Sequence, residues 1–101
     1  RFAHVSANSG GAAILQARGV SSVGRVHTGG YTVTFSQSIQ GCAWTATLTD
    51  NDAGGAEPGE ISVERNSAGD PNTLRVRTFN SAGAAADREV GDGFTVRVDC
   101  P

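Results

Sequence analysis

Apolar and polar residues alternate along most of the chain, which is the pattern of half-buried β-strands. In segment 31–36, Tyr, Val and Phe occupy the odd positions and hydroxyl residues the even ones. In segments 42–49 and 94–100 the even positions carry Cys, Trp, Val, Leu, Phe or Ala, and the odd positions are mainly Thr, Arg or Asp. Weaker alternation marks five further segments, namely 2–7, 12–17, 20–26, 60–65 and 73–80.

Glycine-rich and Asp-Pro turns separate these segments, and about eight strands at this spacing are typical of a sandwich or a barrel. We expect an all-β, antiparallel, jelly-roll-like β-sandwich, with residues 1–101 as one domain. Segment 20–26 contains a shift of phase, and segment 73–80 changes phase at Phe79, which fits a bulge or a second buried face. The alanine-rich segment 82–87 is expected to be a loop or a single turn.

The apolar residues available for a core are few for this length. Fourteen of them are alanine, and fourteen glycines raise the entropy lost on folding. Such a domain needs further support, for which a disulfide and a partner subunit are the two candidates. We therefore expect a homo-oligomer.

Cys42 and Cys100 are the only cysteines, and both fall on the apolar side of their segments, where a bridge between strands would be buried. A bridge between them closes a long loop and predicts an oxidising, secreted or surface-exposed location. The alternative is two buried free thiols in a cytosolic protein. A zinc site is not predicted, because the chain has no CxxC pair. No basic segment followed by an apolar one precedes the first strand, so, with Arg1 first, we expect a processed or excised fragment whose targeting segment lies upstream.

The charge balance argues against nucleic acid as a partner. The formal net charge is −2 and the isoelectric point is about 5.5, whereas nucleic-acid binders are usually basic. No apolar stretch approaches the length of a membrane-spanning helix. We expect the arginines to be surface or interface partners of nearby acids. The arginines are Arg65, Arg75, Arg77, Arg88 and Arg97, and the acids are Glu64, Glu89 and Asp99.

The most polar segment is 50–60. Asp50, Asp52, Glu57 and Glu60 could supply carboxylates to calcium, which prefers several oxygen ligands on a flexible loop. The match to an EF-hand loop is partial, because a glycine replaces the third acidic or amide ligand and Ile61 replaces the final glutamate. The alternative interpretation is an acidic hairpin loop that is simply solvated, with no cofactor.

The sequence contains no catalytic motif that we identify, and we expect no enzyme activity. The chain has no GxSxG elbow, and His4 and His27 lie far apart in sequence. Trp44 and Tyr31 could stack on a sugar ring, but their phase places both in the core instead.

Four stretches of the chain together resemble a known group of domains. They are Gly30–Phe35, Gly41–Thr47, Val76–Gly83 and Phe94–Cys100, which fit the pattern GxYxVTF, CAxxAT, VRTFxxxG and FxxxVxC. Taken together they resemble small β domains of actinobacterial proteins and, more loosely, the C-terminal domains of phage tail-fibre-like proteins. The resemblance covers about residues 19–100 and implies an extracellular β-sandwich, with trimers in the fibre-like relatives.

Our first functional hypothesis is therefore a non-catalytic, extracellular binding or assembly module, a trimeric fibre-tip or surface-adhesion domain. The alternative is a lectin-like domain that binds a cell-surface glycan through loop residues, with calcium held by Asp50, Asp52, Glu57 and Glu60.

Overall fold

The chain forms eight β-strands in the computed structural model, which describes residues 1–50, 58–89 and 92–101. The expected strands are all present, with bounds that differ from the predicted ones by a few residues at most. The strands are β1 (Phe2–Asn8), β2 (Gly11–Arg18), β3 (Val20–His27), β4 (Gly30–Phe35), β5 (Ala43–Thr49), β6 (Glu60–Arg65), β7 (Thr73–Phe79) and β8 (Gly93–Asp99).

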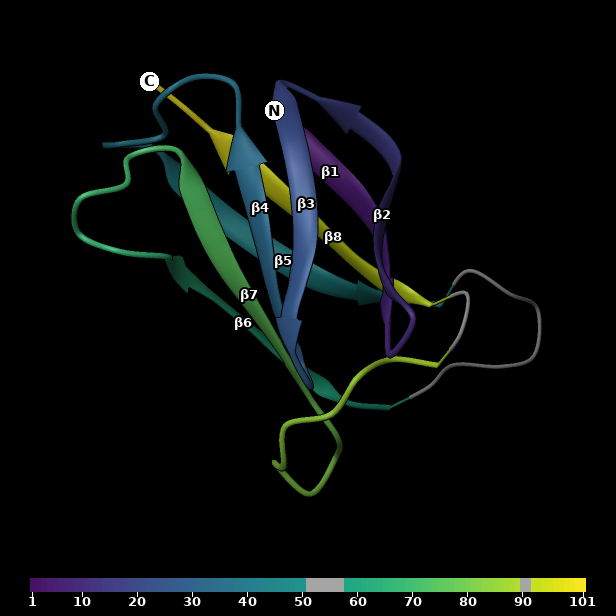
Figure 1. The fold of residues 1–101 in the computed structure, drawn as a ribbon. Helices are drawn as coiled ribbons and strands as arrows, with labels where there is room; N and C mark the ends of the chain where they lie inside the picture. The colour runs from purple at the N-terminus through teal and green to yellow at the C-terminus, as the bar shows by residue number, and fades with distance from the viewer. Residues whose placement is uncertain (51–57, 90–91) are drawn as a thin grey trace.

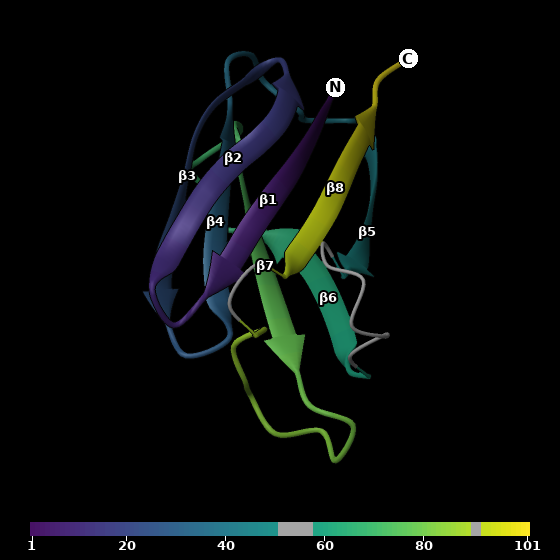
Figure 2. The ribbon, with the colours of Figure 1, turned by 90° about the vertical axis from the view of Figure 1, so that its right-hand side faces the viewer.

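The strands form two antiparallel four-stranded sheets that pack face to face as a sandwich (Figure 1), as the sequence predicted. Sheet A has the order β2-β1-β8-β5, and sheet B has the order β3-β4-β7-β6. Figure 2 looks onto the outer face of sheet A and shows both chain ends at the same end of the sandwich. The described residues include no helix that could span a membrane.

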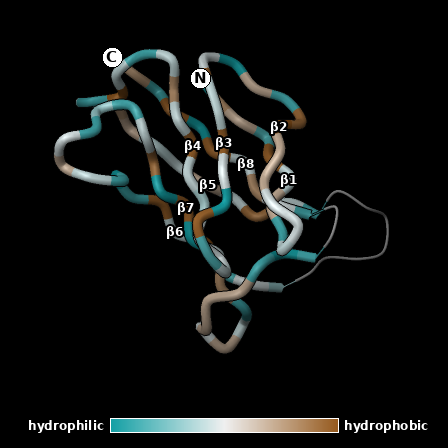
Figure 3. The backbone as a smooth tube through the Cα atoms, in the orientation of Figure 1, coloured by the Kyte–Doolittle hydropathy of each residue, from teal (hydrophilic) through white to brown (hydrophobic). Residues whose placement is uncertain are grey.

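The core lies between the central strands of the two sheets. Sheet A contributes alternate residues of β1 and β8, and sheet B contributes alternate residues of β4 and β7 (Figure 3). The rings of Tyr31 and Phe94, one from each sheet, lie 5.7 Å apart and join the two layers. The buried apolar side chains are Ala3, Val5, Ala7, Tyr31, Val33, Phe35, Ile39, Leu74, Val76, Phe94, Val96 and Val98.

The edge strands carry the irregularities. The pairing of β3 with β4 shifts register twice, between Val20 and Ser22 and between Arg25 and His27, which confirms the expected phase shift in segment 20–26. The pairing of β6 with β7 runs without a shift through Phe79, so of the two alternatives expected there, a bulge or a second buried face, the bulge is absent. Thr78 occupies the buried position instead, and Phe79 is half-buried on the other face.

Glycine is required at two positions that lie unusually close to the backbone of another strand. A Cβ atom built on Gly93, the first residue of β8, would lie 1.8 Å from the Val5 carbonyl oxygen of β1. At Gly29 the backbone has φ +68° and a Cβ atom would lie 2.5 Å from the Thr78 carbonyl oxygen. Only glycine fits at these two positions, because the nearest atoms belong to the backbone of another strand and cannot move aside as a side chain could.

Candidate functional site

The predicted calcium ligands are only partly within the described residues. Asp50 follows directly after β5 and is half-buried, and Glu60 is the first residue of β6 and is exposed. Asp52 and Glu57 lie outside the described residues. Among residues 1–50, 58–89 and 92–101, no group of three or more His, Cys, Asp or Glu side chains could hold a metal ion. The calcium hypothesis stays a prediction, since half of its ligand set is not described.

Cys42 and Cys100 form the expected disulfide, with an S–S distance of 2.11 Å. The bridge lies one residue beyond the Ala43–Asp99 pair, where β5 begins and β8 ends, so it ties two neighbouring strands of sheet A. The prediction that the bridge would be buried is wrong. Cys42 is half-buried and Cys100 is exposed, because both cysteines lie past the strand ends at the open end of the sandwich.

Two of the expected surface ion pairs are present. Arg77 Nη2 lies 3.1 Å from Glu64 Oε1, and Arg97 Nε lies 3.3 Å from Asp99 Oδ1. Both pairs are well exposed and contribute little to stability. Arg88 differs from the prediction, since it is only 5% exposed. Its backbone forms a parallel bridge with Asn8, at the end of β1.

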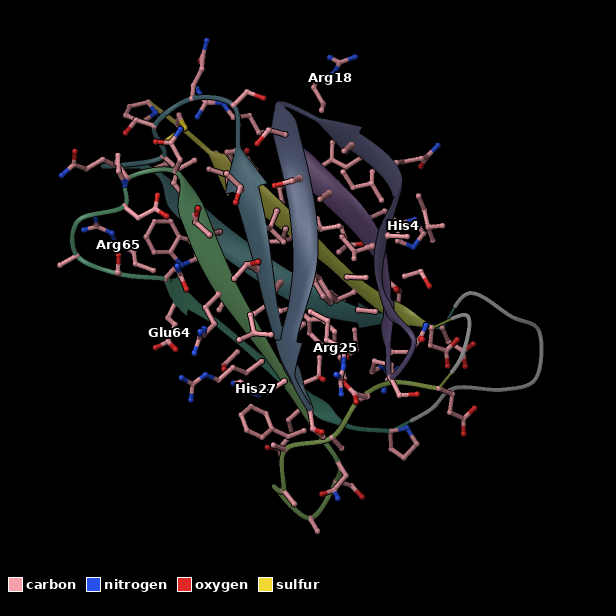
Figure 4. All side chains as sticks on the ribbon, viewed as in Figure 1. His4, Arg18, Arg25, His27, Glu64 and Arg65 are labelled. Carbon is pink, nitrogen blue, oxygen red and sulfur yellow. A yellow bond between two sulfur atoms is a disulfide. The ribbon has the colours of Figure 1, made fainter. Side chains whose placement is uncertain are left out.

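The two histidines are not brought together. His4 alternates with the buried Ala3 and Val5, so its ring lies on the outer face of sheet A (Figure 4). The His27 ring lies over Gly30 in sheet B, where a Cβ atom would approach it within 2.3 Å. Trp44 is half-buried against the core and Tyr31 is fully buried, as their phase predicted.

A polar cluster that the sequence did not reveal joins Arg25, Tyr31 and Asp87. The Tyr31 hydroxyl donates to Asp87 Oδ1 at 2.5 Å, and the Gly29 backbone N–H donates to the same oxygen at 2.9 Å. Arg25 donates from Nη2 to Asp87 Oδ2 at 2.7 Å and from Nε to Oδ1 at 3.2 Å. The cluster fastens the segment after β7 to strands β3 and β4.

The cluster shifts the pKa values of its members in opposite directions. Hydrogen bonds from the Arg25 guanidinium, together with those from Tyr31 and Gly29, lower the pKa of Asp87 to about 2. Burial and the adjacent Asp87 carboxylate raise the pKa of Tyr31 above its ordinary value of 10. Between about pH 2 and pH 10, Asp87 is therefore a carboxylate and Tyr31 a neutral phenol. The contacts of the cluster give it a structural role.

The outer face of sheet A carries a different kind of polar surface. The strand register places Phe2 of β1 opposite Arg18 of β2 on one side and opposite Arg97 of β8 on the other. The next outward row contains His4 and Thr95. An open pocket of about 430 Å³ lies at this end of the face, lined by Arg1, Phe2, Arg18, Thr95 and Arg97.

The flank formed by β2 and β3 is the third notable surface. These are edge strands of the two sheets, and they lie side by side (Figures 1 and 2). Six of the eight β2 residues are exposed. The exposed large hydrophobic side chains among the described residues all lie here: Ile14 is 40% exposed, Leu15 50% and Val26 51%.

No family model, curated protein or solved structure matches the chain.

Proposed function

We propose that this domain is a non-catalytic, extracellular assembly module that associates with a second copy of itself through the β2 edge. The observation that carries the proposal is the exposure of β2 together with its composition. Strand β2 pairs with β1 on one side only, so the backbone N–H and C=O groups on its other side have no strand partner among the described residues. Such an edge is a template for pairing with another chain.

The usual protections of an exposed edge are nearly missing from β2. Monomeric sheets protect their edges with Lys, Pro, inward charges, short strands or bulges. Strand β2 is eight residues long and contains no Lys, Pro, Asp or Glu, and its one charge is Arg18 at the end. It has one bulge, where Leu15 is skipped in the pairing with β1. The segments on either side of Leu15 keep regular register and remain able to pair.

A second copy of the chain is the occupant that fits this edge. Antiparallel pairing of β2 with its symmetry mate would extend sheet A into a continuous sheet of twice its width, and it would bury Ile14 and Leu15 against their counterparts. This would also supplement a core in which the fully buried residues belong mostly to the four central strands. The exposed disulfide supports an oxidising location outside the cell.

Molar mass measured by light scattering across a wide concentration range tests the proposal. We expect the wild-type domain to be a dimer that dissociates on dilution. Leu15→Lys should be monomeric, because a charge on an edge strand opposes pairing. Thr47→Lys is the matched control, since Thr47 is exposed on β5, the other edge of sheet A. It should remain dimeric.

Other outcomes have definite meanings. A wild-type monomer at the highest attainable concentration would refute the assembly role. A trimer, the state that fibre-like domains imply, would keep the assembly role and replace the two-fold β2 pairing with a three-fold contact. Repeating the runs with calcium and then with a chelator tests the lectin-like alternative, because a calcium site would raise the melting temperature only when calcium is present.

A further inference from the structure

On the outer face of sheet A, a phenylalanine of the central strand β1 lies between arginines of the two neighbouring strands. Phe2, Arg18 and Arg97 occupy one row across three strands, fixed by the pairing of β1 with β2 and with β8. The row faces outward, because the flanking residues Ala3 and Val96 are fully buried. Backbone pairing therefore sets the spacing of the three side chains, and the site does not depend on a loop.

Most hydrogen-bond donors of these two arginines are available to a ligand. The side chain of Arg18 makes no hydrogen bond or ion pair with any residue of the described ranges, and Figure 4 shows it extending beyond the end of the strand. Arg97 uses only Nε, toward Asp99, and its side chain is 69% exposed. The Arg1 guanidinium, by contrast, already donates to Ser38 O and Gln37 Oε1. The pocket is therefore cationic. Arg18 carries a charge with no ion-pair partner among the described residues, and Arg97, although paired with Asp99 through Nε, keeps its Nη donors for a ligand.

We infer that this pocket binds an acidic sugar, a hexuronate unit of a glycan chain. The guanidinium fork matches a carboxylate with two parallel hydrogen bonds. The phenyl ring of Phe2 offers a flat apolar surface of the kind that packs against the C–H face of a pyranose. Thr95, which also lines the pocket, adds a hydroxyl for the sugar hydroxyls. The pocket volume of about 430 Å³ lies within the range of small-molecule sites.

The charge pattern favours this ligand over other anions. The sheet face offers a compact pair of arginines around one aromatic ring, whereas a nucleic-acid backbone needs a long basic stripe, and the chain as a whole is acidic. A simple phosphate or carboxylate would use the arginines and leave Phe2 without a role. A sugar ring that carries a carboxylate would contact both the arginines and the ring of Phe2.

Titration of the ¹⁵N-labelled domain with tetragalacturonate, followed by NMR, tests the inference. Fully methyl-esterified tetragalacturonate is the matched ligand, because it has the same rings without the charge. Arg18→Gln and Arg97→Gln remove the fork, and Phe2→Leu keeps apolar bulk while removing the ring. Arg65→Gln is the matched control for charge, since Arg65 is an exposed arginine of β6 in the other sheet.

We expect shifts confined to the strand ends around Phe2 in the wild type. The dissociation constant should rise about tenfold or more in Arg18→Gln, Arg97→Gln and with the methyl ester. It should rise less in Phe2→Leu and stay unchanged in Arg65→Gln. Melting temperatures near the wild-type value would show that the variants fold.

Several results would overturn the inference. Equal weakening in Arg65→Gln and Arg18→Gln would show a general attraction of an acidic polymer. Equal or tighter binding of the methyl ester would indicate a neutral glycan. Tighter binding of a phosphopeptide of the same charge would assign the pocket to a phosphorylated partner, and no shift with tetragalacturonate would exclude the site.

Discussion

The hydroxyl of Tyr31 and the carboxylate of Asp87 lie 2.5 Å apart, although 56 residues separate them in the sequence. Tyr31 packs in the core through its ring and reaches the end of the sandwich through its oxygen. Asp87 belongs to the segment 80–89 after β7, which Thr78 also holds by donating from Oγ1 to the Ala86 carbonyl at 2.6 Å. One core residue thus also fixes the course of a loop.

Tyr31→Phe should destabilise the domain without changing its fold. The substitution keeps the ring contact with Phe94 and removes one hydrogen bond to a charged group, which costs roughly 1.5–3 kcal/mol. Urea denaturation followed by tryptophan fluorescence measures the loss. Because the folded-state pKa of Tyr31 is raised, its contribution is complete below pH 10 and is lost as the pH rises further. The wild type should therefore weaken above pH 10 more than Tyr31→Phe does, and equal alkaline losses would argue against the hydrogen bond.

Acid should loosen the cluster in a defined window. The pKa of Asp87 is lowered from 3.8 to about 2, so its stabilising effect is complete above its ordinary pKa and disappears as the pH falls toward 2. Asp87→Asn should be less stable than the wild type at neutral pH, and the two melting temperatures should converge near pH 2. The pKa of Asp70 is also lowered, chiefly by a hydrogen bond from the Asn72 backbone, so Asp87→Asn should keep a smaller acid dependence. A constant difference between wild type and variant at every pH would contradict the assignment.

Reduction of the disulfide should cost a large part of the stability. The bridge closes a separation of 58 residues, for which chain entropy predicts a contribution of roughly 4 kcal/mol. The Cys42→Ala/Cys100→Ala double variant should match the reduced wild type in urea denaturation. Intact mass after alkylation of the native, unreduced protein provides the independent check, since two alkylated thiols would mean that the bridge does not form.

Gly93→Ala should be among the most destabilising single substitutions. The new methyl group would meet the backbone of both Val5 and Ala7, so β1 and β8 would have to separate. We expect a loss of at least about 3 kcal/mol, the upper end for overpacking. Gly69→Ala is the control, because nothing lies within 4 Å of its Cβ position and its φ is not positive. A thermal melt of both variants decides the point, and similar melting temperatures would contradict it.

The strands and the disulfide could be predicted from the sequence because neither prediction requires the order of the strands in the sheets. Alternation at positions such as Val33 and Val96 depends only on which face of a strand is buried. The pairing of Cys42 with Cys100 needed no knowledge of strand order, since the chain has no other cysteine. The exposure of the bridge could not be predicted, because it depends on where β5 and β8 stop.

The Asp87 cluster and the row of Phe2 and Arg97 depend on which strands pair and in which register. A single sequence does not show this pairing. Nothing near Asp87 distinguishes it from the other acids, and its partners Arg25 and Tyr31 come from strands far away in the chain. Phe2 and Arg97 likewise become neighbours only when β1 pairs with β8. The one available signal was the outward phase of Arg97, which indicated a surface role but not a partner.

Different interactions stabilise the two ends of the domain. The Cys42–Cys100 bridge closes the end where the chain termini lie, and the Asp87 cluster holds the segment after β7, which lies at the opposite end (Figure 1). Local opening should follow the same division: reducing agents would speed amide hydrogen exchange near the start of β5, and acid would speed it in the segment between β7 and β8. Reduction and acid would thus open opposite ends of the same sandwich. In each case the amides at the other end would stay protected from exchange.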